Sequence, residues 1–260
     1  MISYLEVLFI ILKGGRVRGN KLRVALAVSG GGTTMNQILQ ATKDSRLPYV
    51  EPACVIASTD GIGAIMKAEA HGLEMGRDIF VVKKSEFSSP EAYGEELLRI
   101  TRRCGADFWG QYGWIPRTPA NLIEAFAGMA VNQHAGPIRP GRPDFGKLHG
   151  RQTHCARLAF VREMQRNFWT EAVAQRVTVE FDEGAVLDYA RSSIEIKTDD
   201  PETLAARLLP FEHEVQIRTL RAFSENRVQE IKFDDDLVLP HEAALLDQIK
   251  RCARHIFPKG

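Results

Sequence analysis

The chain has 260 residues, of which 44% are hydrophobic and 26% are charged, as in an ordinary globular protein. Its formal net charge of +1 gives no reason to expect a nucleic-acid partner or a strongly acidic one. The four cysteines show no CxxC spacing, so neither a disulfide framework nor a zinc site is expected.

The first twenty residues differ in composition from the rest of the chain. Residues 4–12 are apolar, but this run contains Glu6 and is too short to cross a bilayer. A basic residue does not precede it and a small-residue cleavage site does not follow it, which argues against a secretory signal. We therefore predict an N-terminal appendage over residues 1–20 and a cytoplasmic protein without a membrane partner.

From residue 21 onwards, short apolar runs alternate with helical patterns. Strands are predicted over residues 22–29, 53–58, 78–84, 106–114 and 127–134. Helices are predicted between them, over residues 35–43, 62–72, 85–104 and 119–126. Because these strands are apolar on both faces, the pattern is typical of an open parallel sheet covered by helices.

The second half of the chain continues the same domain. A long helix is predicted over residues 153–175, and residues 176–186 and 192–197 resemble an antiparallel edge pair. Helices follow over residues 201–223 and 240–257. The predicted fold is α/β, an open, mostly parallel, Rossmann-like sheet with helices on both faces and an antiparallel edge extension. We assign residues 21–233 to the catalytic domain and 234–260 to a C-terminal helical extension.

Three glycines and two threonines follow the first predicted strand, in the stretch SGGGTT. In a parallel sheet such a loop leads into a helix N-terminus, where free backbone N–H groups attract anions. The stretch matches neither the GxGxxG pattern nor the P-loop pattern. It therefore indicates either a phosphate site or a tight turn with a Thr cap.

Asn132 and His134 end the fifth predicted strand, just before a loop rich in Gly and Pro. Since side chains alternate along a strand, these two point to one side and Gln133 points to the other. A single His near a strand end is more often structural, but the carboxyl ends of strands in open α/β sheets are also where ligands bind.

Other candidate residues have ordinary explanations when taken alone. Asp182 precedes a Gly turn, and it is either a turn residue or a carboxylate that orients an imidazole. Glu212 lies in a helical stretch that could simply face solvent. Arg139, Arg142 and Arg151 follow the histidine, where they could meet a phosphate or a carboxylate or remain solvated.

Together these motifs stand in an order that resembles the glycinamide ribonucleotide formyltransferases of the folate-dependent formyltransferase superfamily. SGGGTTMNQI resembles that family's phosphate loop, NQHAG its Asn-x-His motif and DEGAV its Asp-x-Gly motif. DDPETLAARLLPFEH resembles the segment that carries its Glu-His pair. The resemblance covers about residues 22–223. It departs after His134, where Ala135 replaces the usual Pro and the loop is longer and more basic.

The resemblance implies that the catalytic residues are Asn132, His134 and Asp182. Asn132 and His134 would donate hydrogen bonds to the oxyanion that forms when an amine attacks a formyl carbon. Asp182 would assist proton transfer from the attacking amine.

The resemblance also implies the binding residues and the substrates. The phosphate residues would be Gly30, Gly31, Gly32, Thr33 and Thr34, and Glu212 would bind the ribose. The folate residues would be Gly113, Trp114, Ile115, Val177 and Thr178. The implied co-substrate is 10-formyltetrahydrofolate and the acceptor is glycinamide ribonucleotide, in purine synthesis. We expect no metal, and a monomer or a homodimer.

Alternatives from other classes remain open. One is a different folate-dependent N-formyltransferase, such as one acting on a sugar nucleotide, or a formyl-folate hydrolase. Another is a nucleotide-binding homologue that has kept the fold and lost turnover, which the altered loop after His134 keeps open.

Overall fold

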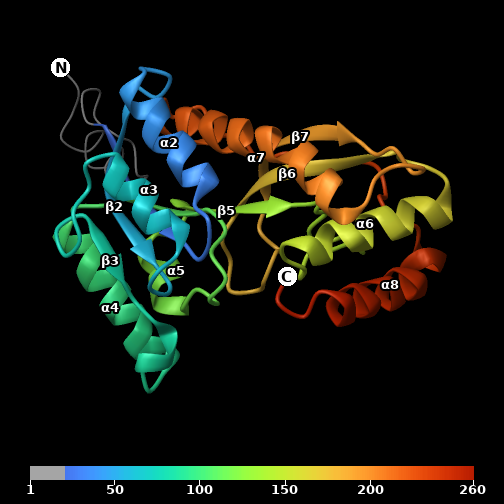
Figure 1. The fold of residues 1–260 in the computed structure, drawn as a ribbon, viewed down its shortest axis with the longest axis horizontal. Helices are drawn as coiled ribbons and strands as arrows, with labels where there is room; N and C mark the ends of the chain where they lie inside the picture. The colour runs from blue at the N-terminus through green and yellow to red at the C-terminus, as the bar shows by residue number, and fades with distance from the viewer. Residues whose placement is uncertain (1–20) are drawn as a thin grey trace, which may run out of the picture.

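A computed structural model of the protein describes residues 21–260, and the predicted appendage over residues 1–20 lies outside this range. Within residues 21–260 one seven-stranded sheet runs through the molecule, in the order β3-β2-β1-β4-β5-β6-β7 (Figure 1). The strands are β1 (Leu22–Val28), β2 (Val50–Ala57), β3 (Ile79–Val81), β4 (Phe108–Gln111), β5 (Ala130–Ala135), β6 (Trp169–Arg176) and β7 (Val186–Ser193). Strands β1 to β5 are parallel, and β6 pairs antiparallel with both β5 and β7. The predicted α/β architecture with an antiparallel edge extension is confirmed.

Helices cover both faces of the sheet, because β1 is apolar on both sides. Leu22, Val24, Leu26 and Val28 pack in one cluster with α2 (Thr33–Lys43), α3 (Gly63–Ala70) and α7 (Pro201–Ser224). Ala25 and Ala27 alternate with them and pack in the opposite cluster with α4 (Pro90–Arg103) and α5 (Ala120–Ala125). Short 3₁₀ turns, η1 (Lys84–Glu86) and η2 (Pro240–Glu242), precede α4 and α8.

The helix predicted over residues 153–175 is wrong in its second half. Helix α6 (Arg151–Met164) stops early, and Gln165 and Asn167 turn the chain out of it with φ angles of 50° and 54°. The stretch that follows includes Ala, Glu and Gln, which favour helices in isolation. Here it lies between β5 and β7 and pairs with both as β6, so tertiary pairing overrides local propensity.

The predicted edge pair is therefore displaced along the chain. Instead of residues 176–186 and 192–197, the structure pairs β6 with β7. Residues 177–185 become the connecting loop, and Asp182 lies in that loop instead of at a strand end. The displacement matters for function because the loop starts beside the amino end of β5, where the Val177 amide donates to the Ala130 carbonyl, and reaches His134 through Asp182.

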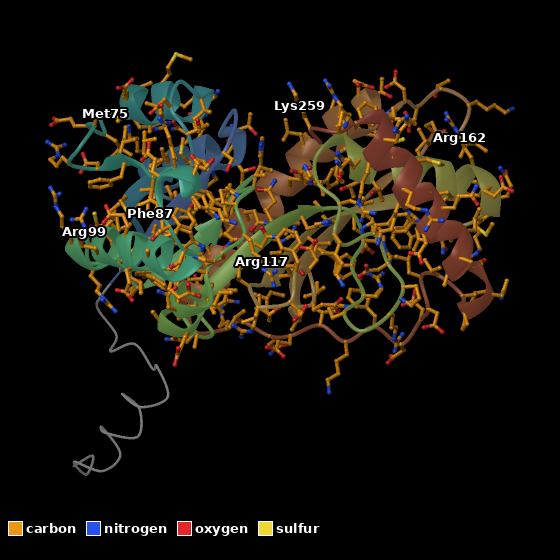
Figure 2. The ribbon with its side chains drawn as sticks, turned by 90° about the horizontal axis from the view of Figure 1, so that it is seen from below. Met75, Phe87, Arg99, Arg117, Arg162 and Lys259 are labelled. Atoms are coloured by element: carbon orange, nitrogen blue, oxygen red, sulfur yellow. The ribbon has the colours of Figure 1, made fainter. Side chains whose placement is uncertain are left out.

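The predicted C-terminal extension contains α8 (Ala243–Ile256), which packs against α6. The shared apolar cluster consists of Phe145, Leu148, Ala156, Phe160, Leu237, Val238, Leu246 and Ala253. Figure 2 labels Arg162 of α6 at this end of the molecule, Met75 and Arg99 at the opposite end, and Arg117 and Lys259 between them. Across residues 21–260, none of the helices has the length and apolar character needed to cross a membrane.

Candidate active site

The site begins where the strand order changes direction, between β1 and β4. After β1 the chain builds β2 and β3 on one side, then returns to build β4 on the other. The two loops that leave β1 and β4 meet here. The Ser29 amide donates to the Gly113 carbonyl (3.1 Å), and the Ile115 amide donates to Ser29 Oγ (3.0 Å). Doubly wound sheets bind their ligands in the crevice at this position.

The glycine loop after β1 is shaped by a close contact with α3. Gly32 has φ 64°, and a Cβ on it would lie 2.6 Å from the Ala64 Cβ, so a side chain is excluded there. The Ala64 amide also donates to the Gly30 carbonyl (3.1 Å). Helix α2 starts directly after Gly32, and among the described residues its N-terminus has no side-chain cap, so the alternative of a Thr cap is not observed. Its first N–H groups therefore suit an anion.

Strand β5 divides its side chains between two environments, as the alternation of a strand predicts. Gln133 faces α7, where its Nε2 donates to the Glu212 carboxylate. Asn132 lines a pocket on the other side of the strand, together with Asp182. His134 lies on that same side, with its Nε2 3.7 Å from Asp182 Oδ2. The structure thus brings together the three predicted catalytic side chains.

The His134 ring is only 5% exposed and faces two carbonyl oxygens. Its Nδ1 lies 3.1 Å from the Gly136 carbonyl, and its Nε2 lies 3.2 Å from the Leu148 carbonyl. Both ring nitrogens can donate at the same time only when the imidazole is a cation. The Asp182 carboxylate lies beside the same ring, so oxygen acceptors stand near both ring nitrogens.

The Asp182 carboxylate is held by two donors. The Lys147 amide donates to its Oδ2 (2.7 Å), and Gln175 Nε2 donates to its Oδ1 (2.6 Å). Asp182 has φ 60°, a left-handed conformation that is uncommon outside glycine but tolerated by Asp and Asn. Strained backbone of this kind concentrates at functional sites.

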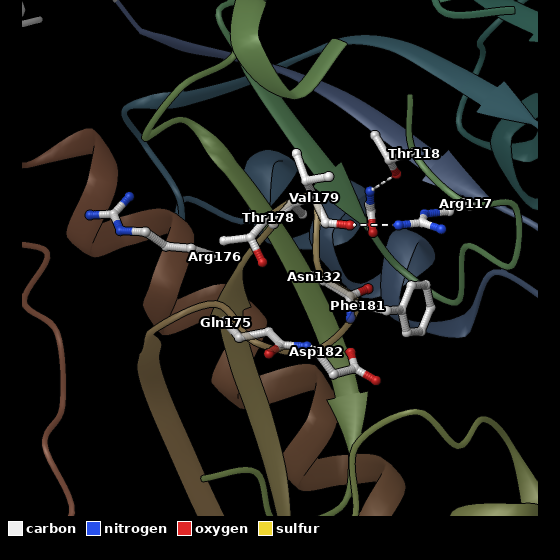
Figure 3. A pocket seen from close by; sticks show the side chains of 11 residues that line it. Arg117, Thr118, Asn132, Gln175, Arg176, Thr178, Val179, Phe181 and Asp182 are labelled. Atoms are coloured by element: carbon white, nitrogen blue, oxygen red, sulfur yellow. Dashed lines mark hydrogen bonds between the residues drawn. The ribbon is translucent and has the colours of Figure 1, made fainter. Parts of the chain in front are cut away.

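A pocket opens beside Asn132 and Asp182 (Figure 3). Its lining residues come from the ends of β4, β5 and β6 and from the loops after β4 and β6: Gln111, Arg117, Thr118, Asn132, Gln175, Arg176, Val177, Thr178, Val179, Phe181 and Asp182. Arg117 joins two of these loops, because its Nη2 donates to the Val179 carbonyl (3.0 Å).

The predicted folate residues fall in two places. Val177 and Thr178 line the pocket. The side chain of Trp114 instead packs edge-on against Trp109 in the core, with ring centroids 5.8 Å apart, so it does not form a pocket wall. Gly113 and Ile115 lie at the contact between the β1 and β4 loops, and the Ile115 side chain is 55% exposed.

Each arginine of the long loop after His134 meets a carboxylate of the protein. Arg139 is buried and makes two hydrogen bonds to Glu171. Arg142 Nη1 lies 3.2 Å from Asp236 Oδ1, and Arg151 Nε lies 3.1 Å from Glu202 Oε1. Of the alternatives that the sequence left open, the structure gives Arg139 a buried protein carboxylate, while Arg142 and Arg151 stay largely exposed in their ion pairs.

Glu212 is buried against Gln133, and burial raises the pKa of its carboxyl to about 7. The ordinary value is 4.5, so between these two pH values the folded protein holds a proton that the unfolded chain has lost. Stability from this group is therefore complete below pH 4.5 and is lost as the pH rises through about 7.

We expect Glu212→Gln to remove this pH dependence, because the amide cannot ionise. The unfolding free energy of the unmutated protein should fall relative to the variant by on the order of 3 kcal/mol between those pH values. Urea unfolding of both proteins at several pH values measures the difference between their unfolding free energies. The contributions of the other titrating groups cancel in this difference, because both proteins contain them. If the unfolding free energies of the two proteins changed in parallel with pH, the pKa of Glu212 would not be raised by folding.

Several residues of the site escaped the sequence analysis. Gln175 was placed in a helix, and the Lys147 and Leu148 contacts are made by backbone atoms, which no sequence motif marks. His154 on α6 lies near His134, and burial lowers the pKa of its imidazole to about 4, so it is neutral at pH 7. Across residues 21–260 there is no group of three or more His, Cys, Asp or Glu side chains that could hold a metal ion.

Comparison with known proteins places the chain in a family. Residues 22–220 match the formyl transferase family. The chloroplastic phosphoribosylglycinamide formyltransferase of Arabidopsis thaliana is 26% identical over 211 residues, which cover 80% of this chain and 67% of that protein. A trifunctional purine biosynthetic protein of Drosophila pseudoobscura pseudoobscura is 26% identical over 81% of this chain. The matched region makes up only 14% of that longer relative.

Solved structures show the same fold. The phosphoribosylglycinamide formyltransferase of Bacillus halodurans has a TM-score of 0.66 and 25% identity, covering 77% of this chain and 94% of that one. A formyltetrahydrofolate deformylase from Pseudomonas syringae pv. tomato shares the fold at a TM-score of 0.66 and 20% identity, covering 82% of this chain and 64% of that one. The resemblance to phosphoribosylglycinamide formyltransferases found in the sequence is thereby confirmed, and this chain belongs to the formyl transferase family of enzymes.

Proposed function

We propose that this protein transfers the formyl group of 10-formyltetrahydrofolate to the primary amine of glycinamide ribonucleotide, a step of purine biosynthesis. The convergence of Asn132, His134 and Asp182 at the carboxyl end of β5 carries the chemical part of the proposal. The choice of acceptor is supported by the names of the relatives that the chain matches over most of its length.

In this proposal Asn132 and His134 stabilise charge at the formyl carbon. When the amine attacks, an oxyanion develops, and the Asn132 amide and the His134 imidazolium donate hydrogen bonds to it. His134 Nε2 now faces the Leu148 carbonyl, so the oxyanion would replace that carbonyl as acceptor. Losing one such donor typically raises a reaction barrier by about 2.7–4 kcal/mol.

In the same proposal Asp182 is the general base that takes the proton of the attacking amine. Its carboxylate lies next to the His134 ring and lines the pocket, so it can accept the proton of the attacking amine directly or through a water. When the tetrahedral intermediate collapses, the bond between the formyl carbon and the folate nitrogen breaks, and the same proton passes to that nitrogen as tetrahydrofolate leaves. The same carboxylate lies 3.7 Å from His134 Nε2, so it would also orient the ring for donation to the oxyanion.

The remaining parts of the site would hold the two substrates. The N–H groups at Gly30–Thr34 would bind the ribonucleotide phosphate, and Glu212 would accept hydrogen bonds from the ribose. The pocket offers apolar side chains to a flat ring, from Val177, Val179 and Phe181, together with the hydroxyl of Thr178. Apolar walls with nearby polar groups are the surroundings that a formylated pterin would need for its ring and its polar edge.

A two-substrate assay tests the proposal. We expect purified protein to release tetrahydrofolate from 10-formyltetrahydrofolate when glycinamide ribonucleotide is present and not when it is omitted. Release without any acceptor would identify a formyl-folate hydrolase, the activity named for the Pseudomonas structure that shares the fold. Turnover with an amino-sugar nucleotide alone would identify another N-formyltransferase. Binding of substrates without turnover would identify a non-catalytic homologue.

A further inference from the structure

Helix α8 lies outside the part of the chain that matches the family, which ends at residue 220, yet it contacts the candidate active site through one short segment. This segment is the pair Lys147–Leu148, in the loop between β5 and α6. The Lys147 amide donates to Asp182 Oδ2 (2.7 Å), and the Leu148 carbonyl faces His134 Nε2 (3.2 Å). Two consecutive residues therefore contact both members of the His134–Asp182 pair.

The pair adopts a conformation that needs support from its surroundings. Lys147 has φ 63°, a left-handed value that a residue with a side chain rarely adopts, and Asp182 across the hydrogen bond has φ 60°. Such backbone persists only where neighbouring contacts hold it in place. The flanking Asp144 supplies some of them, because it accepts hydrogen bonds from the Arg139 amide (2.6 Å) and the Gly146 amide (2.8 Å).

Helix α8 supplies the rest from one face. Leu246, Lys250, Ala253 and Arg254 are spaced so that they lie on the same side of a helix. Leu246 and Ala253 pack in a buried cluster with Phe145 and Leu148. Arg254 Nη2 donates to the Lys147 carbonyl (3.1 Å).

Lys250 adds a charge at the same place. Burial lowers the pKa of Lys250, and the nearby Asp144 carboxylate opposes this change. Lys250 lies on the side of α8 whose neighbours Leu246 and Ala253 pack against Phe145 and Leu148, so its charge is near the carboxylate that organises residues 139–146. Apolar packing, a hydrogen bond and a charge from α8 all converge on the segment that contacts Asp182 and His134.

We propose that α8 positions the reacting groups, with Arg254 and Lys250 as positioning residues that act through the Lys147–Leu148 pair. The expected loss of kcat rests on the proposed function, but the expected loosening of Lys147 and Leu148 can be measured without turnover. When the contacts from α8 are lost, Lys147 and Leu148 move more freely, and the Asp182 carboxylate and the His134 ring lose their fixed geometry.

Arg254→Ala and Lys250→Met test this with a matched control on the same helix. Arg251→Ala removes an equal charge from an exposed position of α8. We expect Arg254→Ala and Lys250→Met to lower kcat roughly tenfold, since small misplacements of reacting groups are costly, while KM stays unchanged. Arg254→Lys retains a donor and should restore most of the rate, and Arg251→Ala should have no effect.

Amide hydrogen exchange gives a readout without turnover. The Lys147 amide should exchange roughly tenfold faster in Arg254→Ala and Lys250→Met, while core amides of β1 and β4 keep their protection. Uniformly faster exchange would indicate simple destabilisation and overturn the positioning role. The positioning role would also be overturned if Arg254→Ala and Lys250→Met matched Arg251→Ala in both amide exchange and kcat. If the unmutated protein shows no formyl transfer, the proposed function fails, and the exchange experiment still decides whether α8 holds Lys147.

Discussion

Replacing Asp182 with Asn is expected to lower kcat for formyl transfer by about a hundredfold to ten-thousandfold, the range typical for loss of a general acid–base group. The carboxylate is the group placed to take the proton of the attacking amine, and it lies 3.7 Å from the His134 ring. Asn has nearly the same shape and tolerates the left-handed backbone at this position, so the change removes charge and basicity while keeping the loop.

The asparagine amide also breaks the pattern of donors around the site. Both carboxylate oxygens now accept hydrogen bonds, from the Lys147 amide and from Gln175. In the variant an NH₂ group must face one of these donors, and the imidazolium of His134 loses its neighbouring negative charge. Loss of rate should therefore appear in kcat, with smaller changes in KM.

Glu180→Gln is the matched control for this experiment. It removes one carboxylate from an exposed position of the same loop. Steady-state kinetics should give a kcat within about twofold of the unmutated protein, because exposed charges are screened by solvent. If Asp182→Asn retains a comparable rate, Asp182 is not the proton acceptor and the catalytic assignment is wrong.

Replacing Glu171 with Gln is expected to lower the unfolding free energy by about 3–5 kcal/mol, the cost of breaking a buried ion pair by removing one partner. Glu171 is 0% exposed and Arg139 is 1% exposed. Two hydrogen bonds of 3.0 and 3.2 Å join them, and Arg191 Nε adds a third to Glu171 (3.0 Å). The variant leaves the Arg139 cation buried without a counter-charge, and its amide directs N–H groups at a guanidinium.

Urea unfolding measures this loss as a lower transition midpoint with an unchanged m-value. Arg151→Ala is the control, because it breaks a half-exposed ion pair with Glu202 in the same region of the chain. That change should cost only about 0–1 kcal/mol. A similar small cost for Glu171→Gln would mean that Arg139 finds other partners and that the pair does not anchor the loop after His134.

Much of this fold could be predicted because its signals are local. The first strand is apolar on both faces, which indicates a central position in a parallel sheet. Helix α4 begins where Ser89 caps it and Pro90 follows, and α7 begins with Asp200 and Pro201 in the same way. The sequence also predicted that Asn132 and His134 lie together, because the alternation of side chains along a strand places these two residues on one face of β5.

The sequence by itself therefore determined the α/β class, the mostly parallel sheet and the candidate residues at the carboxyl ends of its strands. Tertiary structure alone decided the rest. Residues 169–176, which include Ala, Glu and Gln, became a strand because β5 and β7 offered hydrogen bonds on both sides. The partners of Asp182 and His134 include a backbone amide and a backbone carbonyl, which every residue type carries, so only the packing of distant segments such as α8 decides which of them reach the site.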